Sequence, residues 1–200
     1  MSAEFLDIMA KRRTIYELKN ESPISDDRIQ DILKHALLHV PSAFNSQTTR
    51  IVLLVKEEHI KLWQIVKHTI KAKVPAEAWP ASKQRLSKFQ AGYATILFYN
   101  DQVVVRAMQQ KFANYADKFP GWAIETNGMH QYAIWTTLEA EGLGANLQHY
   151  NPLIDQEVQD TWGLSGDWRL QAQLVIGTPS GHAGDKVFSP VGERFKVYGV

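Results

Sequence analysis

Apolar residues recur along the chain at spacings of three and four, and this pattern predicts helices. The clearest case is residues 25–40, where Ser25 is the expected N-cap and two aspartates occupy the first turn. The apolar face of this helix consists of Ile29, Ile32, Leu33, Ala36, Leu37 and Val40. Further helices are expected around residues 5–9 and at residues 57–74, 80–93, 102–118, about 123–142 and 155–163.

Continuous apolar runs predict strands. They occur at residues 50–56, 94–101 and 169–179. Interleaved helices and short strands indicate an α/β or α+β domain, and the strands are few and widely separated for a doubly wound sheet. The sequence contains no internal repeat and no Pro/Gly-rich linker. We therefore expect residues 1–200 to form a single domain.

The charge balance excludes several classes of partner. The 200 residues include 22 basic and 21 acidic residues, for a formal net charge of +1. No global field draws such a chain to nucleic acid or to an anionic membrane. The absence of cysteine removes disulfides, thiolate metal sites and cysteine nucleophiles. With no cleavage-site pattern and no apolar run of membrane-spanning length, we expect a cytoplasmic protein.

Arg12, Arg13 and Thr14 follow the first expected helix and concentrate positive charge there. Cations at a helix C-terminus are favourable through the macrodipole and need no ligand. Alternatively, the two guanidinium groups bind a phosphate bidentately, with the threonine hydroxyl completing the site. The stretch alone leaves both interpretations open.

Two further stretches carry polar side chains between expected elements. In residues 39–50, turn chemistry explains Ser42 well, but Asn45 and Gln47 also offer the paired donor and acceptor that a polar heterocycle needs. In residues 141–152, Gly142 and Gly144 do not fit a dinucleotide fingerprint, because no third glycine follows and no strand precedes them. We interpret them as a helix end followed by close approach of the backbone to a flat group.

Histidines 35 and 39 have the spacing of a metal pair but lack a third partner, so we expect a solvated helix face and no metal site. No nucleophile elbow or P-loop is present. A group of large aromatic residues in irregular mid-chain segments is either ordinary packing or the lining of an apolar substrate slot. This group comprises Trp79, Phe112, Tyr115, Phe119 and Trp122.

Four segments together resemble the nitroreductase family of FMN-dependent oxidoreductases, and in particular the branch named after the yeast fatty-acid-repression-mutant protein. They are KRRTIYELK, PSAFNSQTTR, GLGANLQHYNP and GERFKVYG, in that order along nearly the whole chain. The resemblance implies an α+β, nitroreductase-like fold with a central antiparallel sheet surrounded by helices. It also implies an intertwined homodimer in which the C-terminal extension crosses the partner and FMN binds at the interface. The apolar tail, residues 187–200, agrees with a segment that packs on a second subunit.

The resemblance also implies roles for individual residues. Arg12, Arg13 and Thr14 would meet the FMN phosphate and ribityl chain, joined by Arg194 and Lys196 from the tail. Partner-subunit contacts to the flavin would come from Ser42, Asn45 and Gln47. The isoalloxazine face would be bordered by Gln148, His149, Tyr150 and Asn151. Many family members carry a basic residue near the flavin pyrimidine where this chain has Tyr16, and Lys71 or Lys73 is the expected replacement.

The implied activity is a ping-pong cycle in which NADH or NADPH delivers hydride to flavin N5 and a nitroaromatic, a quinone or a similar small acceptor then takes it. One alternative is a flavin-binding regulatory or sensor protein in a lipid or redox stress response, with incidental turnover. Another is a helical interaction protein without a cofactor. The sequence leaves open the natural acceptor, the preference between NADH and NADPH, and the extent of nitro reduction.

Overall fold

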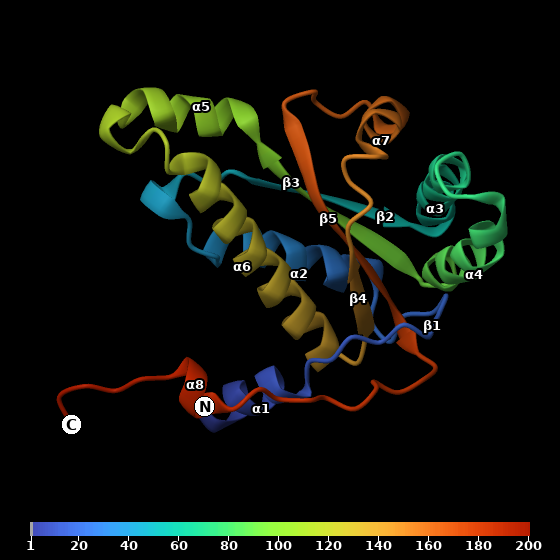
Figure 1. The fold of residues 1–200 in the computed structure, drawn as a ribbon, viewed down its shortest axis with the longest axis horizontal. Coiled ribbons are helices and arrows are strands. Elements are labelled where there is room, and N and C mark those ends of the chain that lie inside the picture. Colours follow the sequence, from blue (N-terminus) through green and yellow to red (C-terminus); the bar gives the residue numbers. More distant parts are fainter. Residues whose placement is uncertain (1) are drawn as a thin grey trace.

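The computed structural model describes residues 2–200 and contains one antiparallel sheet. The strand order is β1-β5-β3-β2, and β4 also pairs with β5 (Figure 1). The strands are β1 (Leu18–Lys19), β2 (Thr49–Val55), β3 (Ala94–Asp101), β4 (Gly144–Gln148) and β5 (Trp168–Pro179). The three runs predicted as strands are confirmed as β2, β3 and β5, and the predicted antiparallel sheet is confirmed as well.

Helices surround this sheet. They are α1 (Ser2–Lys11), α2 (Asp26–His39), α3 (Lys56–Lys71), α4 (Trp79–Gln90), α5 (Gln102–Lys111), α6 (Phe119–Ala140), α7 (Asp155–Trp162) and α8 (Val191–Arg194). Short 3-10 turns are η1 (Ala43–Asn45), η2 (Ala76–Ala78) and η3 (Ala113–Tyr115). No helix within residues 2–200 combines the length and the apolar character needed to cross a membrane.

The core consists of two apolar layers, one on each face of the sheet. All eight residues of β3 are buried, and their side chains alternate between the layers. Leu97 and Tyr99 belong to the layer beneath α3, α4 and α7, whereas Ile96 and Phe98 pack with α2 and α6. Burial on both faces explains why this strand is a continuous apolar run rather than an alternating one.

Helix boundaries follow local chemistry, with one correction to the prediction. The side chain of Ser25 accepts a hydrogen bond from the Arg28 amide, as expected of an N-cap. The single helix predicted over residues 102–118 is wrong, because Phe112 leaves helical geometry at φ −125° and ψ 64°. A 3-10 turn follows, and α6 begins at Phe119, earlier than the predicted 123, with a proline in its first turn.

Two glycines follow the end of α6, and the second of them lies against β1. Gly142 has φ +91°, the left-handed conformation that ends a helix. Gly144 begins β4, and a Cβ there would lie 2.9 Å from the Leu18 side chain. The predicted helix end is confirmed, whereas the close approach at Gly144 is to apolar side chains of the chain itself and not to a flat group.

A buried polar network joins α3 to β3. His59 contacts Thr95 Oγ1 through Nδ1 at 2.9 Å and the Gln90 carbonyl through Nε2 at 3.2 Å. The Trp63 indole donates to the same threonine oxygen at 3.0 Å. Because a carbonyl only accepts, Nε2 carries the proton and Nδ1 accepts from the threonine hydroxyl. Burial lowers the pKa of His59 to about 4, which keeps the imidazole neutral.

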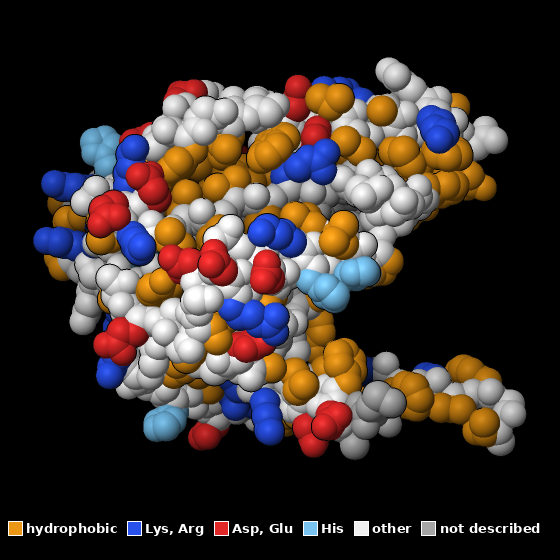
Figure 2. All heavy atoms as spheres, turned by 180° about the vertical axis from the view of Figure 1, so that it is seen from behind, with side chains coloured by type: hydrophobic (Ala, Val, Ile, Leu, Met, Phe, Trp, Pro, Cys, Tyr) orange, Lys and Arg blue, Asp and Glu red, His pale blue; other side chains and the backbone are white. Residues whose placement is uncertain are grey.

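The C-terminal tail leaves the body of the molecule. Beyond β5 the chain runs past α1 and extends outward, and Figure 2 shows apolar side chains along this projection. Phe188, Phe195 and Tyr198 are 68%, 65% and 89% exposed. Such aromatic exposure at a chain end is unusual for a segment that contacts only solvent.

Candidate functional site

Residues Arg12 to Tyr16 connect α1 to β1 and form one wall of a cavity of about 540 Å³. The Arg12 amide makes a hydrogen bond to the Ile8 carbonyl at 3.1 Å, which closes α1. Thr14 then pairs in parallel with Ala145 of β4, and the Ile15 amide donates to the Ala145 carbonyl at 2.9 Å. The segment therefore lies along the edge of β4, with a fixed backbone.

The cavity is predominantly cationic. Its lining comprises Arg12, Arg13, Thr14, Tyr16, Glu17, Lys88, His182, Gly184, Asp185 and Lys186. Four of these are lysine or arginine, whereas two are acidic. One of the acidic groups, Glu17, lies 3.5 Å from Lys88 Nζ. The remaining excess of guanidinium, ammonium and hydroxyl donors suits a multiply charged oxyanion.

Glu139 of α6 fixes the backbone of Arg13 directly and the position of Arg12 through Trp135. Its carboxylate accepts the Arg13 backbone amide at 2.8 Å and the Trp135 indole N–H at 3.2 Å. The Arg12 guanidinium lies over the Trp135 ring, 4.6 Å from its centroid. Burial raises the pKa of Glu139, and the two arginines act in the opposite direction. The Arg13 side chain also donates to the Gly184 carbonyl, which brings the chain after β5 to the cavity.

A second cavity, of about 520 Å³, adjoins the first because Tyr16 and Lys88 line both. Its lining residues are Tyr16, Ala81, Gln84, Arg85, Lys88, Phe89 and Gln148. Gln148 donates to Asn146 Oδ1 at 2.9 Å, and Asn146 in turn donates to the Ile15 carbonyl at 2.9 Å. This series of hydrogen bonds orients the Gln148 amide at the cavity wall, beside the rings of Tyr16 and Phe89.

The other residues predicted beside Gln148 have different surroundings. Tyr150 packs against Trp63 and Phe89, with ring centroids 5.8 and 6.4 Å apart, and burial raises its pKa. Asn151 accepts a hydrogen bond from the Gln173 amide at 3.2 Å, and His149 is exposed. Of the four residues, only Gln148 is among those that line the cavity.

Ser42, Asn45 and Gln47 lie elsewhere in the chain. Ser42 and Gln47 line a separate cavity of about 320 Å³, and the Ser42 hydroxyl accepts the Gln47 amide at 3.0 Å. Turn geometry involves Asn45 and Gln47 as well as Ser42, although the sequence indicated it clearly for Ser42 alone. Phe44, Asn45 and Gln47 all have positive φ, between 50° and 55°.

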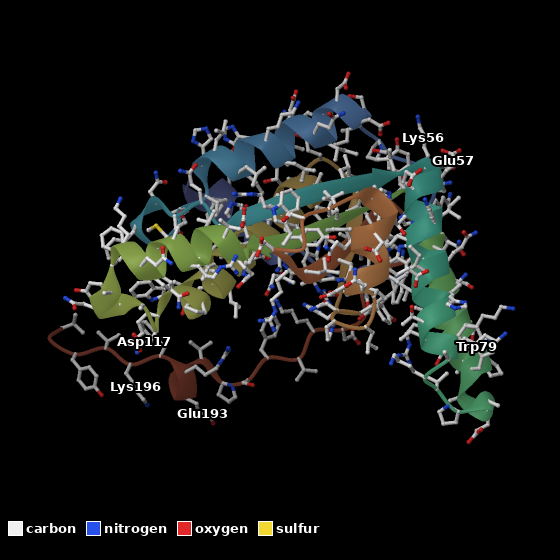
Figure 3. The ribbon with its side chains drawn as sticks, turned by 90° about the horizontal axis from the view of Figure 1, so that it is seen from above. Lys56, Glu57, Trp79, Asp117, Glu193 and Lys196 are labelled. Carbon is white, nitrogen blue, oxygen red and sulfur yellow. The ribbon has the colours of Figure 1, made fainter. Side chains whose placement is uncertain are left out.

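The remaining predicted cations also lie outside the Arg12 cavity of their own chain. Arg194 and Lys196 donate to carbonyls of the tail itself, those of Ser189 at 3.0 Å and Gly192 at 3.1 Å. Figure 3 shows Lys196 on the extended tail, far from Trp79. Lys71 ends α3 and is exposed. The predicted cofactor residues thus lie mainly in three separate groups, around Arg12, around Ser42 and on the tail, and Lys71 lies apart from all three.

Four of the five predicted aromatic residues do cluster, and the sequence missed a fifth member. Phe44 lies 4.6 Å from Phe112 and 5.9 Å from Trp122 between ring centroids. Tyr115 and Phe119 complete the group, which we call the aromatic cluster. Trp79 does not belong to it, because Figure 3 places Trp79 at the far end of the α3–α4 arm, opposite Asp117. An isolated aromatic residue within the polar run PSAFNSQ was the available signal for Phe44.

Sequence reasoning also missed the cations contributed by other elements. Arg85 and Lys88 are three residues apart on α4, a spacing that places them on one face. That spacing was visible, but nothing in the sequence showed which cavity they face. In the described part of the chain, no group of three His, Asp or Glu side chains could hold a metal ion.

Comparison with known proteins identifies the family of the chain. The sequence model of the nitroreductase family matches residues 9–178. HBN1 of Saccharomyces cerevisiae is 36% identical over 189 residues, which cover 93% of each chain. The structure of the nitroreductase CinD from Lactococcus lactis, in complex with chloramphenicol, superimposes with a TM-score of 0.89 at 42% identity, covering 98% of this chain and 100% of CinD. A nitroreductase from Saccharomyces cerevisiae gives 0.78 at 33% identity, covering 89% and 97%.

Proposed function

The chain belongs to the nitroreductase family of oxidoreductases, and on that premise we propose that it is an FMN-dependent NAD(P)H oxidoreductase. Its acceptors would be nitroaromatics, quinones or similar small molecules. One observation carries the proposal, namely the pair of adjoining cavities that meet at Tyr16 and Lys88. One cavity is rich in cations, and the other is bordered by aromatic rings and an oriented amide. FMN has this same division between a dianionic phosphate and a flat heterocycle.

The donor set fits the phosphate end of FMN. Arg12 and Arg13 offer guanidinium forks, and Thr14 adds a hydroxyl beside them. Lys186 adds an ammonium group at the same cavity. These side chains would bind and neutralise the phosphate, because charged hydrogen bonds to an oxyanion are the strongest available in a solvent-facing cavity.

The second cavity suits the ring. Tyr16 is 55% exposed and provides an accessible ring, while Phe89 is almost fully buried and packs against it. Gln148 presents an amide held by Asn146. When bound, FMN supplies the hydride transfer at N5 that links NADH or NADPH to an acceptor. The chain's own residues would hold and orient the cofactor and exclude water, so no acid or base from the protein is required.

Two residues of α4 are candidates for the basic group near the flavin pyrimidine, where this chain has Tyr16. The expected replacement cation was Lys71, or Lys73, but Lys71 is exposed at the end of α3. Arg85 and Lys88 share a cavity with Tyr16 and Gln148. We propose that these two cations face the pyrimidine edge and stabilise negative charge there.

We further propose a homodimer that joins the separated groups of predicted residues. Within one chain, Ser42 and Gln47 line a cavity of their own, and Arg194 and Lys196 donate to carbonyls of the tail. A partner would bring both groups to the FMN of the other protomer. The exposed aromatic residues of the tail support this, together with exposed Phe5 and Leu6 on α1 and Ile124 on α6. These surfaces supply apolar area for an obligate interface.

The acceptor class rests on the relatives and on the aromatic cluster. CinD has been solved with chloramphenicol and with 4-nitrophenol, both of which carry a nitro group on an aromatic ring. Tyr115 is 49% exposed and Phe44 50% exposed, so two rings of the cluster present accessible faces. We propose that these faces stack on acceptor rings in the assembled dimer.

The test is the visible absorbance spectrum of the purified protein before and after anaerobic NADH. We expect flavin bands that bleach with NADH and return with a quinone. Steady-state turnover at physiological NADH would then separate an enzyme from a flavin-binding regulator, for which binding without appreciable turnover is expected. A protein that stays colourless after incubation with FMN would refute the proposal.

A further inference from the structure

Residues 42–49 form a strained segment that needs an external support. Phe44, Asn45 and Gln47 have φ of 55°, 52° and 50°, and none of them is glycine. Left-handed backbone costs about 1 kcal/mol or more for each such residue, so it persists only where the surroundings determine it. The contacts that determine the conformation of this segment therefore need to be identified.

Arg50 supplies one support at the start of β2. Its Nη1 donates to the Gln47 carbonyl at 2.8 Å and to the Thr49 carbonyl at 3.0 Å. Its Nη2 lies 2.9 Å from Asp101 Oδ2, at the end of β3. One guanidinium thus connects the backbone of the strained segment to a nearly buried carboxylate.

Asp101 makes this connection rigid. Its other oxygen, Oδ1, accepts the Val103 amide at 2.9 Å and caps α5. Its own amide donates to the Thr48 carbonyl at 2.9 Å. The segment is therefore joined to α5 through one ion pair and one backbone hydrogen bond, while Phe44 inserts among the rings of the aromatic cluster farther along.

We propose that Arg50 and Asp101 are positioning residues, which hold the Gln47 carbonyl so that Asn45 and Gln47 are presented in the conformation that binds FMN. This inference rests on the proposed function. It assigns to the ion pair a role in cofactor binding and not only in folding. A guanidinium suits the role because its planar fork reaches a carbonyl and a carboxylate at once.

The chain contains a matched control pair. Arg106 Nη2 lies 2.7 Å from Asp167 Oδ1, and this ion pair also links α5 to a neighbouring segment. It makes no contact with residues 42–49. Arg50→Gln and Arg106→Gln therefore remove the same chemical group from the same region, but only Arg50 has hydrogen bonds to carbonyls of the strained segment. Asp101→Asn is a milder second variant, because asparagine can still cap α5.

Two measurements on each purified variant test the proposal. The first is amide hydrogen exchange of residues 43–49 in the flavin-free protein. The second is the FMN dissociation constant from equilibrium dialysis, with the visible circular dichroism of the bound flavin. We expect Arg50→Gln and Asp101→Asn to accelerate exchange, raise the dissociation constant about tenfold, as loss of an orienting outer group typically does, and change the dichroism. Arg106→Gln should leave all three unchanged.

Each other outcome overturns the inference in a recognisable way. Unchanged hydrogen exchange in Arg50→Gln would show that the ion pair does not hold the segment, regardless of the FMN dissociation constant. Faster exchange with unchanged FMN affinity and dichroism would reduce the pair to a folding role. A wild-type protein that binds no FMN would refute the proposed function and this inference together, and the wild-type dialysis identifies that case.

Discussion

The buried imidazole of His59 predicts a specific loss of stability at acidic pH. In the folded protein its pKa is lowered from 6.5 to about 4 by burial, whereas the unfolded chain titrates near the ordinary value. As pH falls, the unfolded state therefore binds a proton first. The stability that depends on a neutral His59 is complete above pH 6.5 and is lost as pH falls toward 4.

The magnitude follows from the size of this window. One pKa unit corresponds to about 1.4 kcal/mol, so the shift of His59 corresponds to about 3 kcal/mol of unfolding free energy. Most of it, about 2.5 kcal/mol, should be lost by about pH 4.5. His130 is also buried with a lowered pKa and contributes in the same direction. The assay must therefore isolate His59 by substitution.

The assay compares His59→Gln with the wild type by urea unfolding, followed by far-ultraviolet circular dichroism at neutral and acidic pH. Protein concentration is held constant, because association contributes to apparent stability. The variant should be less stable at neutral pH yet lose about 2.5 kcal/mol less on acidification. His68→Gln, an exposed histidine on the same helix, is the control and should behave like the wild type. Equal losses in His59→Gln and the wild type would refute the reasoning.

Four other predictions concern the site and its surroundings. Arg12→Ala should weaken FMN binding by about 1.5 to 3 kcal/mol, tenfold or more in affinity, and unchanged flavin retention after dialysis would contradict this. Truncation before Val187 should abolish both dimerisation and flavin binding, as judged by sedimentation and absorbance, and a flavin-loaded monomer would show that the proposed place of the tail is wrong. Phe119→Ala should cost about 3 to 5 kcal/mol in urea unfolding, because the ring is only 2% exposed. Tyr115→Ala should cost less than about 1 kcal/mol but raise the KM for nitroaromatic acceptors, and an unchanged KM would remove Tyr115 from the acceptor slot.

Periodicity predicted most elements because the forces that set them are local. Ser25 and the apolar face behind it specify α2 within a few turns of chain, and a long apolar run specifies β3. The sequence did not predict the helix break at Phe112, because the composition on both sides of this residue favours helix. At this break the Phe112 ring packs against Phe44, nearly seventy residues earlier in the sequence. No local pattern encodes such a contact.

Only the consecutive residues of the candidate site could be predicted from the sequence. Arg12, Arg13 and Thr14 are consecutive, so their charge was visible in the sequence. Lys88 and Lys186 reach the same cavity from elements that meet only after β1 and β4 have both paired with β5. Trp79 is the opposite case. Its aromatic side chain suggested that it belongs to the aromatic cluster, but the fold places it at the end of the α3–α4 arm. Chemical type was predictable, and proximity required the fold.

The contact between Arg12 and Trp135 makes the indole an internal optical reporter. A cation 4.6 Å from the ring centroid shifts the energy of the excited indole, and the Trp135 N–H is already fixed by Glu139. An oxyanion that binds Arg12 would screen that cation and change the emission of Trp135. Inorganic phosphate alone would then produce a fluorescence signal, without any flavin to absorb or quench it. Occupancy of the phosphate end could thus be followed separately from occupancy of the ring end.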